Sequence, residues 1–159
     1  MKKSMLLIAA CVLADQGIKA LVRLTPLGTV IWRADALLEI VHVRNTGAAF
    51  SLMDSSPMLV TMISAVLVAA LGIAVLGRMR LTAPARVAAA LVLGGGLGNL
   101  IDRMLYGAVT DYIRLLLLRF PVFNLADILI SASTFVLLIL LFSGKLEQPD
   151  TGDAHVPES

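Results

Sequence analysis

The sequence predicts an all-α, polytopic membrane protein with four transmembrane helices. Hydrophobic residues make up 58% of the 159 residues and charged residues only 15%, and the mean hydropathy is +0.91. A water-soluble chain of this size has too much surface to hide so many apolar side chains. The apolar residues also fall into four separate runs, each close to the ~20 residues that a helix needs to cross a bilayer.

The predicted spans leave short polar connections and one polar tail. Prolines stand at the expected starts of the second and third spans, where a missing N–H is harmless because the first N–H groups of a helix have no partner. The spans are residues 4–24, 57–77, 84–106 and 122–143. They are joined on one side by residues 25–56 and 107–121, and residues 145–159 form a tail that we expect to be disordered. We therefore predict one membrane domain over residues 1–144.

The first span has an alternative interpretation as a cleavable leader of the lipoprotein type. Two lysines precede a short apolar stretch that ends at Cys11. That stretch, Met5–Ala10, is short for such a leader, and the apolar pattern continues to Val22. We interpret the segment as a retained helix. Cys11 is the only cysteine, which excludes an intramolecular disulfide and a cysteine-rich metal site.

The basic residues predict the orientation of the chain in the membrane. Loops on the cytoplasmic side carry an excess of Lys and Arg. The connection between the second and third spans is purely basic, whereas the two segments 25–56 and 107–121 mix both signs of charge. We expect both termini in the cytoplasm and those two segments outside. The net charge of +2, without a basic run interleaved with aromatic residues, gives no indication of nucleic-acid binding.

Polar side chains of separate spans fall at one depth, near the outer surface. Ionisable residues inside a membrane are energetically costly and usually mark function. Apart from Arg86 at the cytoplasmic start of the third span, the inner half of each predicted span is free of charge, so the chain lacks the polar steps at all depths that an ion path would need. The pattern indicates a site that opens to the outer leaflet. The residues in question are Asp15, Lys19, Asn99, Asp102, Arg103, Asn124 and Asp127, with Asp111 in the nearby loop.

Each of these residues also has a simpler structural interpretation. Asp15 and Lys19 are spaced i,i+4 and can neutralise each other as an intrahelical ion pair. Arg103 can extend to the lipid headgroups, and Asp127 can compensate the dipole at the start of its helix. Residues 45–50 can form a plain turn. These interpretations suffice one by one, but they do not explain the shared depth.

Paired carboxylates are the chemistry that this set of residues supports. His42 and His155 are the only histidines, so a Ser-His-Asp or Cys-His arrangement is not available near the membrane site, and a His/Cys metal site is unsupported. Two aspartates that share a proton can activate a water molecule. Asp111 and Asp127 flank one short connection and are modestly preferred for this role. Two aspartates with a basic neighbour remain alternatives: Asp15 and Asp102.

Five polar motifs follow one another in an order that resembles a known family. They are DQGIK at residues 15–19, NTGAAF at 45–50, GGLGNLIDR at 95–103, VTDY at 109–112 and FNLAD at 123–127. This order, on a profile of four spans, resembles bacterial lipoprotein signal peptidases (signal peptidase II), which are aspartic peptidases of the cytoplasmic membrane. The similarity covers about residues 4–142.

The resemblance implies an activity and a set of site residues. Asp111 and Asp127 match the positions of a catalytic dyad, whose water attacks the carbonyl just before a lipid-modified cysteine. The implied substrate is a diacylglyceryl-modified prolipoprotein, and no metal or organic cofactor is implied. Positions that match substrate-binding or supporting residues are Asp15, Lys19, Asn45, Gly47, Asn99, Asp102, Arg103 and Asn124.

The resemblance also implies a fold and a location. Residues 25–56 match a small extracytoplasmic β-cradle, in which we expect a short strand at 37–43. The implied fold also includes a short interfacial helix, and the segment after Asp111 matches a clamp over the site. We expect a monomer in the bacterial inner membrane, in contact with lipids, with its active site facing the outer leaflet. Departures from the family's common residues, at Ile18, Tyr112 and Arg114, affect the clamp more than the dyad.

Two other classes of protein compete with the peptidase hypothesis. A small four-helix transporter could use Asp15 near the midplane, and a structural membrane subunit could use the charged pairs to join its spans. A relative that only binds lipoproteins is a third alternative. Asparagine at both Asp111 and Asp127 would discriminate, because a transporter or scaffold should tolerate the change and a peptidase should not.

Overall fold

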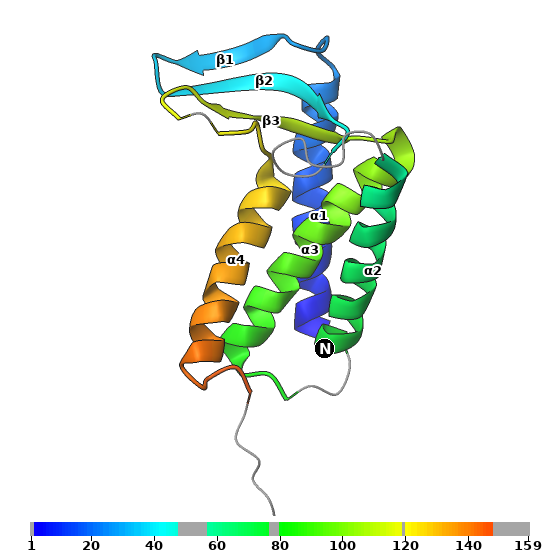
Figure 1. Cartoon of the computed structure of the whole chain (residues 1–159), viewed down its shortest axis with the longest axis vertical. Coiled ribbons are helices and arrows are strands. Elements are labelled where there is room, and N and C mark those ends of the chain that lie inside the picture. The colour runs from blue at the N-terminus through cyan, green and yellow to red at the C-terminus, as the bar shows by residue number, and fades with distance from the viewer. Residues whose placement is uncertain (1, 48–56, 77–79, 119, 148–159) are drawn as a thin grey trace, which may run out of the picture.

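The computed structural model describes residues 2–47, 57–76, 80–118 and 120–147. Four helices stand side by side, and a three-stranded sheet covers one end of the bundle (Figure 1). The elements in chain order are α1 (Lys2–Arg23), β1 (Val30–Ala34), β2 (Leu38–Asn45), α2 (Pro57–Leu76), α3 (Ala83–Tyr106), β3 (Val109–Leu115) and α4 (Leu125–Phe142).

The helices lie where the hydropathy of the sequence predicts them, each end within three residues of the expected limit. Three of them, α1, α3 and α4, are long and apolar enough to cross a membrane, and the apolar stretch of α2 over Pro57–Ile73 is shorter. Large apolar side chains on the outside of the bundle remain exposed, such as Phe135 at 65% and Leu13 at 73%. An apolar helix surface that no protein covers is the surface that faces lipid.

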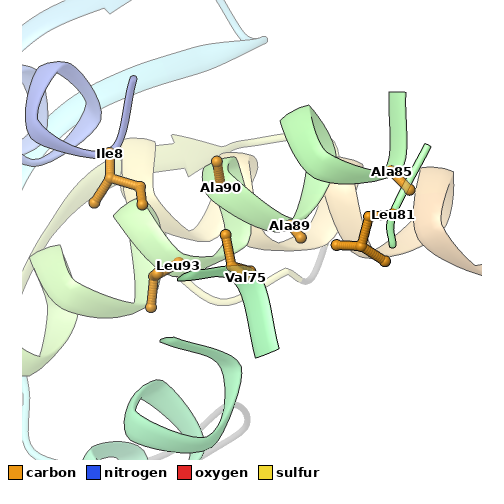
Figure 2. Packing of buried hydrophobic residues seen from close by; sticks show 7 residues of the cluster. All are labelled: Ile8, Val75, Leu81, Ala85, Ala89, Ala90 and Leu93. Atoms are coloured by element: carbon orange, nitrogen blue, oxygen red, sulfur yellow. The ribbon is translucent and has the colours of Figure 1, made fainter. Parts of the chain in front are cut away.

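Helix α3 lies at the centre of the bundle and packs against the other three helices (Figure 1). Its buried face is rich in alanine and glycine, which lets the neighbouring backbones approach closely. A Cβ atom added to Gly95 would lie only 2.7 Å from the carbonyl oxygen of Ala126 in α4. At the end remote from the sheet, small residues of α3 pack with larger apolar side chains (Figure 2). This cluster comprises Ile8, Val75, Leu81, Ala85, Ala89, Ala90 and Leu93.

The sheet is antiparallel with strand order β1-β2-β3. Its middle strand β2 confirms the strand expected at 37–43 and extends it to Asn45. In β3, Ile113 pairs with Ile40 and Asp111 pairs with Val43.

In the segment after Asp111, which we expect to form the clamp, strand β3 continues to Leu115 from its start at Val109, and residues 116–118 form a turn. The reason is the free edge of β2, which supplies backbone partners for β3. Phe123 then folds back to bond with Ile113, at 2.8 and 3.0 Å.

The first residues of the predicted tail are ordered. The backbone N–H of Thr82 donates to the carbonyl of Leu146 at 3.1 Å, and Leu81 forms an isolated bridge with Glu147. These contacts tie the end of α4 to the start of α3. Residues 148–159 of the predicted tail, like residues 48–50 of the NTGAAF motif, lie outside the described residues.

Candidate active site

All ten residues singled out in the sequence converge below the sheet. They come from the sheet-proximal parts of α1, α3 and α4, from β3 and from the end of β2, elements that are far apart in the chain (Figure 1). Hydrogen bonds connect most of them, and Gly47 joins the group by donating its N–H to the side-chain oxygen of Asn45 at 3.1 Å. Within the described residues, every buried side-chain nitrogen and oxygen has a hydrogen-bond partner. The shared depth therefore reflects one connected site.

Asp111 and Asp127 are each held by asparagine amides. Asn45 and Asn124 donate from Nδ2 to the two carboxylate oxygens of Asp111, at 2.9 and 2.6 Å. Asn99 donates from Nδ2 to Oδ1 of Asp127 at 2.8 Å. The carboxyl of Asp111 is buried, with only 1% of the residue exposed. Amide donors fix both carboxyl groups without neutralising them, which leaves them able to exchange protons.

The surroundings of Asp111 favour its protonated form. Burial, followed by the charge of the neighbouring Asp127, raises the pKa of Asp111 to about 6, and the hydrogen bonds from Asn45 and Asn124 offset only part of this. Two carboxyl groups that influence each other titrate as a pair. One protonated and one ionised carboxyl together can donate a proton and accept another.

The start of α4 explains the spacing of the FNLAD motif. Asn124 is the N-cap residue, and its side chain accepts the backbone N–H of Asp127 at 3.0 Å. In return, the carboxylate of Asp127 accepts the backbone N–H of Asn124 at 3.1 Å. This reciprocal capping box satisfies two N–H groups that a helix start leaves free. The same exchange turns the Nδ2 of Asn124 towards Asp111, so one helix cap positions both carboxylates.

A fully buried lysine determines how Asn99 is oriented. The Nζ of Lys19 donates to the side-chain oxygen of Asn99 at 2.8 Å. Because an ammonium group can only donate, it must face the oxygen of the amide, and the NH₂ of Asn99 must then point to Asp127. Lys19 is thereby linked to a dyad position through one intervening side chain, although it does not contact that aspartate.

The charge of Lys19 is balanced within the bundle. Its Nζ lies 2.8 Å from Asp15 and 3.7 Å from Asp102, and all three side chains are fully buried. Arg23 supplies the second positive charge, with Nη1 3.1 Å from Asp102. The intrahelical pair Asp15–Lys19 predicted from the i,i+4 spacing is present, as one part of this larger network.

Three contributors to the site were not assigned a role in the sequence. Gln16 donates to Asp102 and to the carbonyl of Gly98, both at 3.0 Å. Arg23 pairs with Asp102, and the hydroxyl of Tyr112 accepts the N–H of Leu125 at 3.1 Å. Gln16 was detectable, because it is a polar residue between the two charged residues of its motif. Arg23 and Tyr112 are typical of helix ends and strands, and only the folded arrangement reveals their contacts.

Two neighbouring cavities share part of their walls beside Asp127. A cavity of about 200 Å³ is lined by Asn45, Gly47, Asp111, Asp127 and the 120–123 segment. A larger cavity of about 410 Å³ runs between α2, α3 and α4, with mostly apolar walls. Both are lined by Asn99, Arg103 and Asp127. The site can therefore hold a polar group beside the carboxylates and an apolar chain next to it.

Within the described residues, His, Cys, Asp and Glu side chains do not gather in a group of three or more that could hold a metal ion. The carboxylates of the site instead contact amides, an ammonium and a guanidinium, as described above. The expectation of no cofactor stays a prediction.

Three described helices long enough to cross a membrane, with a carboxylate-lined cavity near one end of the bundle, fit an integral membrane enzyme. A solved structure with the same fold supports this class: a bacterial membrane enzyme determined by the in meso method at 2.3 Å resolution. It superposes with a TM-score of 0.82 at 26% identity, covering 100% of this chain and 95% of the other.

Sequence comparisons identify the family. The family model for signal peptidase (SPase) II matches residues 7–143. The lipoprotein signal peptidase of Brevibacillus brevis is 36% identical over 138 residues, which are 86% of this chain and 93% of the relative. The lipoprotein signal peptidase of Dehalococcoides mccartyi is 37% identical over 152 residues, which are 91% of this chain and 92% of the relative. The chain belongs to the signal peptidase II family of bacterial membrane peptidases. The transporter and scaffold alternatives are thereby excluded.

Proposed function

We propose that this protein is an intramembrane aspartic endopeptidase in which Asp111 and Asp127 form the catalytic dyad. Its substrate would be a diacylglyceryl-modified prolipoprotein, cleaved just before the lipidated cysteine. The observation that carries the proposal is the pair of carboxyl groups that line one cavity, each held by asparagine amides. Family membership supports removal of signal peptides from prolipoproteins.

The raised pKa of Asp111 suggests which carboxyl group acts as general acid and which as general base. Asp127, as carboxylate, would take a proton from a water molecule while the water oxygen bonds to the scissile carbonyl carbon. Asp111, protonated near its pKa of about 6, would give its proton to the carbonyl oxygen. As the tetrahedral intermediate collapses, the C–N bond breaks and the leaving nitrogen takes the proton held by Asp127. At the same time, a hydroxyl of the intermediate returns its proton to Asp111, and the carbonyl of the carboxylic product forms.

Groups around the dyad would bind the peptide backbone and keep it in place. Arg103 lines both cavities, so its guanidinium can donate to substrate carbonyls where the polar and apolar cavities meet. Asn45 and Gly47 also line the smaller cavity and would contact the residues next to the cleaved bond. Asn99 and Asn124 already bond to the carboxylates, so their role would be to orient the dyad.

The larger cavity would hold the apolar part of the substrate. Side chains on its rim remain exposed, such as Ile63 at 44% and Leu67 at 63%, so a membrane-embedded segment could enter sideways from the lipid. This arrangement fits α2 as a fourth span beside the other three helices. With the basic connections in the cytoplasm, the sheet and the dyad would face the outer leaflet. A lipid-anchored cysteine then reaches the dyad while its acyl chains stay in the membrane.

The decisive experiment is a gel-shift cleavage assay with purified protein in detergent or lipid. Diacylglyceryl-modified prolipoprotein is compared with the unmodified precursor, using wild type, Asp111→Asn and Asp127→Asn. Loss of one carboxyl should lower turnover by about 10⁴-fold, because the two act as a unit. Asp35→Asn is a matched control: this residue lies outside the site, in the turn between β1 and β2, at φ 44°, a conformation that asparagine also tolerates. Cleavage that persists in either dyad variant would refute the assignment.

A further inference from the structure

A third cavity lies at the sheet end of the bundle and is separate from the proposed active site. Its volume is about 290 Å³, and none of its lining residues also lines the two cavities at the carboxylates. The walls come from the end of α1, the strand β2, the last turn of α3 and the start of β3. The lining residues used below are Arg23, Leu27, His42, Arg44, Tyr106 and Thr110.

Two guanidinium groups line this cavity, and its described walls include no carboxylate. The charge of Arg23 is already used inside the bundle, since Asp15 and Asp102 together balance Lys19 and Arg23. Arg44 is exposed and donates to a backbone carbonyl, that of Tyr106. A carbonyl does not cancel its charge, so the cavity keeps a net positive charge that favours an anion.

Arg23 is held rigidly in the wall. Its Nη1 also donates to the hydroxyl of Thr110 at 3.1 Å, and its guanidinium lies 4.5 Å from the centre of the Tyr106 ring. His42 is also fixed, because its Nδ1 lies 2.7 Å from the carbonyl oxygen of Thr25 and must donate to it. A wall that is already ordered loses little conformational entropy when it binds a ligand.

The ends of the helices indicate that the cavity lies at the level of the lipid headgroups. Both α1 and α3 end here, and polar backbone of the sheet begins. Tyr106, at the last position of α3, is 46% exposed, and tyrosine is typical of the interface between hydrocarbon and water. Leu27 in the cavity wall is 60% exposed, and Leu24 nearby in the chain is 81% exposed. Such a site offers cations to a headgroup and apolar side chains to the start of its acyl chains.

We propose that this cavity binds the phosphate diester of an anionic phospholipid. Arg44 and Arg23 would donate to the phosphate oxygens, with guanidinium geometry that suits two oxygens at once. The site stands independently of the proposed catalytic mechanism. The lipid site nevertheless lies next to the proposed active site. Thr110 in its wall directly precedes Asp111 and donates its backbone N–H to Asp102 at 2.8 Å. A bound lipid would therefore steady the strand that carries Asp111.

The test is a titration of the detergent-purified full chain with phosphatidylglycerol, read as a shift of the thermal unfolding midpoint. Phosphatidylcholine and free glycerol 3-phosphate are titrated in parallel. We expect phosphatidylglycerol to stabilise the protein at lower concentration than either. Arg44→Gln should weaken its apparent affinity by about five-fold, the effect of one basic residue at a membrane surface. Asp127→Asn should keep the full effect, which separates this site from the substrate cavity.

Arg33→Gln is the matched control, since it removes the same charge from an exposed residue of the same sheet, 58% exposed and outside the cavity. An equal loss of affinity in this variant would mean a diffuse surface effect and would overturn the proposal. Equal stabilisation by phosphatidylcholine would also overturn it, and so would an equal effect of glycerol 3-phosphate, which would assign the site to free phosphate. The comparisons of phosphatidylglycerol with phosphatidylcholine and with glycerol 3-phosphate both use wild type. They therefore test the proposal even where a variant does not fold.

Discussion

The two ends of the helix bundle are built on different principles from the same helices. Helix α1 contributes Ile8 to the apolar cluster at one end and Lys19 to the charged network at the other. In a membrane, an apolar side chain gains little by leaving lipid for protein, so the apolar end depends on close packing alone. The charged end must keep its ions away from hydrocarbon, which requires one particular set of partners. Specificity of the fold should therefore reside at the sheet end.

The sharpest test of this contrast is Lys19→Met. The change leaves two buried carboxylates, Asp15 and Asp102, with Arg23 as the remaining cationic partner among the residues that the structure describes. Breaking such a group costs about 3–5 kcal/mol of stability. Unfolding in mixed detergent should show this loss, and Lys19→Met combined with Asp15→Asn should recover part of it. A single variant as stable as wild type would show that the charged end is no more specific than the apolar end.

The pH dependence of stability should report the burial of Asp111. Its pKa is raised from near 3.8 to about 6, so the folded state binds this proton more tightly than the unfolded state. The resulting stabilisation is fully present below pH 3.8 and is lost as pH rises through 6, at most about 3 kcal/mol in total. We expect wild type to lose more stability than Asp111→Asn between about pH 4 and pH 7. Parallel curves for the two proteins would contradict the assigned pKa.

Gly95→Ala tests the close packing that joins α3 to the start of α4. The new Cβ would lie 2.7 Å from the carbonyl oxygen of Ala126, a backbone atom that cannot turn aside. Overpacking of this kind costs about 1–3 kcal/mol, and activity should fall as well because Ala126 precedes Asp127. Gly72→Ala is the control, since its Cβ would meet Leu93 at an ordinary 3.9 Å. Thermal unfolding and cleavage rates of both variants show whether stability and activity depend on the close packing at Gly95.

The smallest effect is expected at the apolar end, from Ile8→Val. The substitution removes one methyl group from the cluster around Ala90 and Leu93 (Figure 2). In a soluble protein it would cost about 0.5–1.5 kcal/mol, and lipid that fills the gap should reduce the loss further. Cleavage activity should not change. A loss comparable to that of Lys19→Met would remove the distinction between the two ends.

The sequence alone predicted the helices and the convergence of the polar residues, because both depend on local hydropathy and on depth along a span. It could not predict β3, whose pairing partner β2 lies some 70 residues earlier in the chain, as in the pair Ile40–Ile113. It also could not predict how Asn99 is oriented, which depends on a lysine from another helix. Contacts of this kind exist only in the assembled bundle, so no motif by itself indicates them.

The capping box of α4 has a consequence for how such a protein is made. On the proposed mechanism, one dyad residue sits in the first turn of the last helix, and its orientation depends on α1 and α3. A growing chain that has inserted its first three helices would hold Asp111 but not Asp127. Proteolytic activity would therefore switch on only when synthesis and insertion are complete, which protects the membrane from a partly built protease.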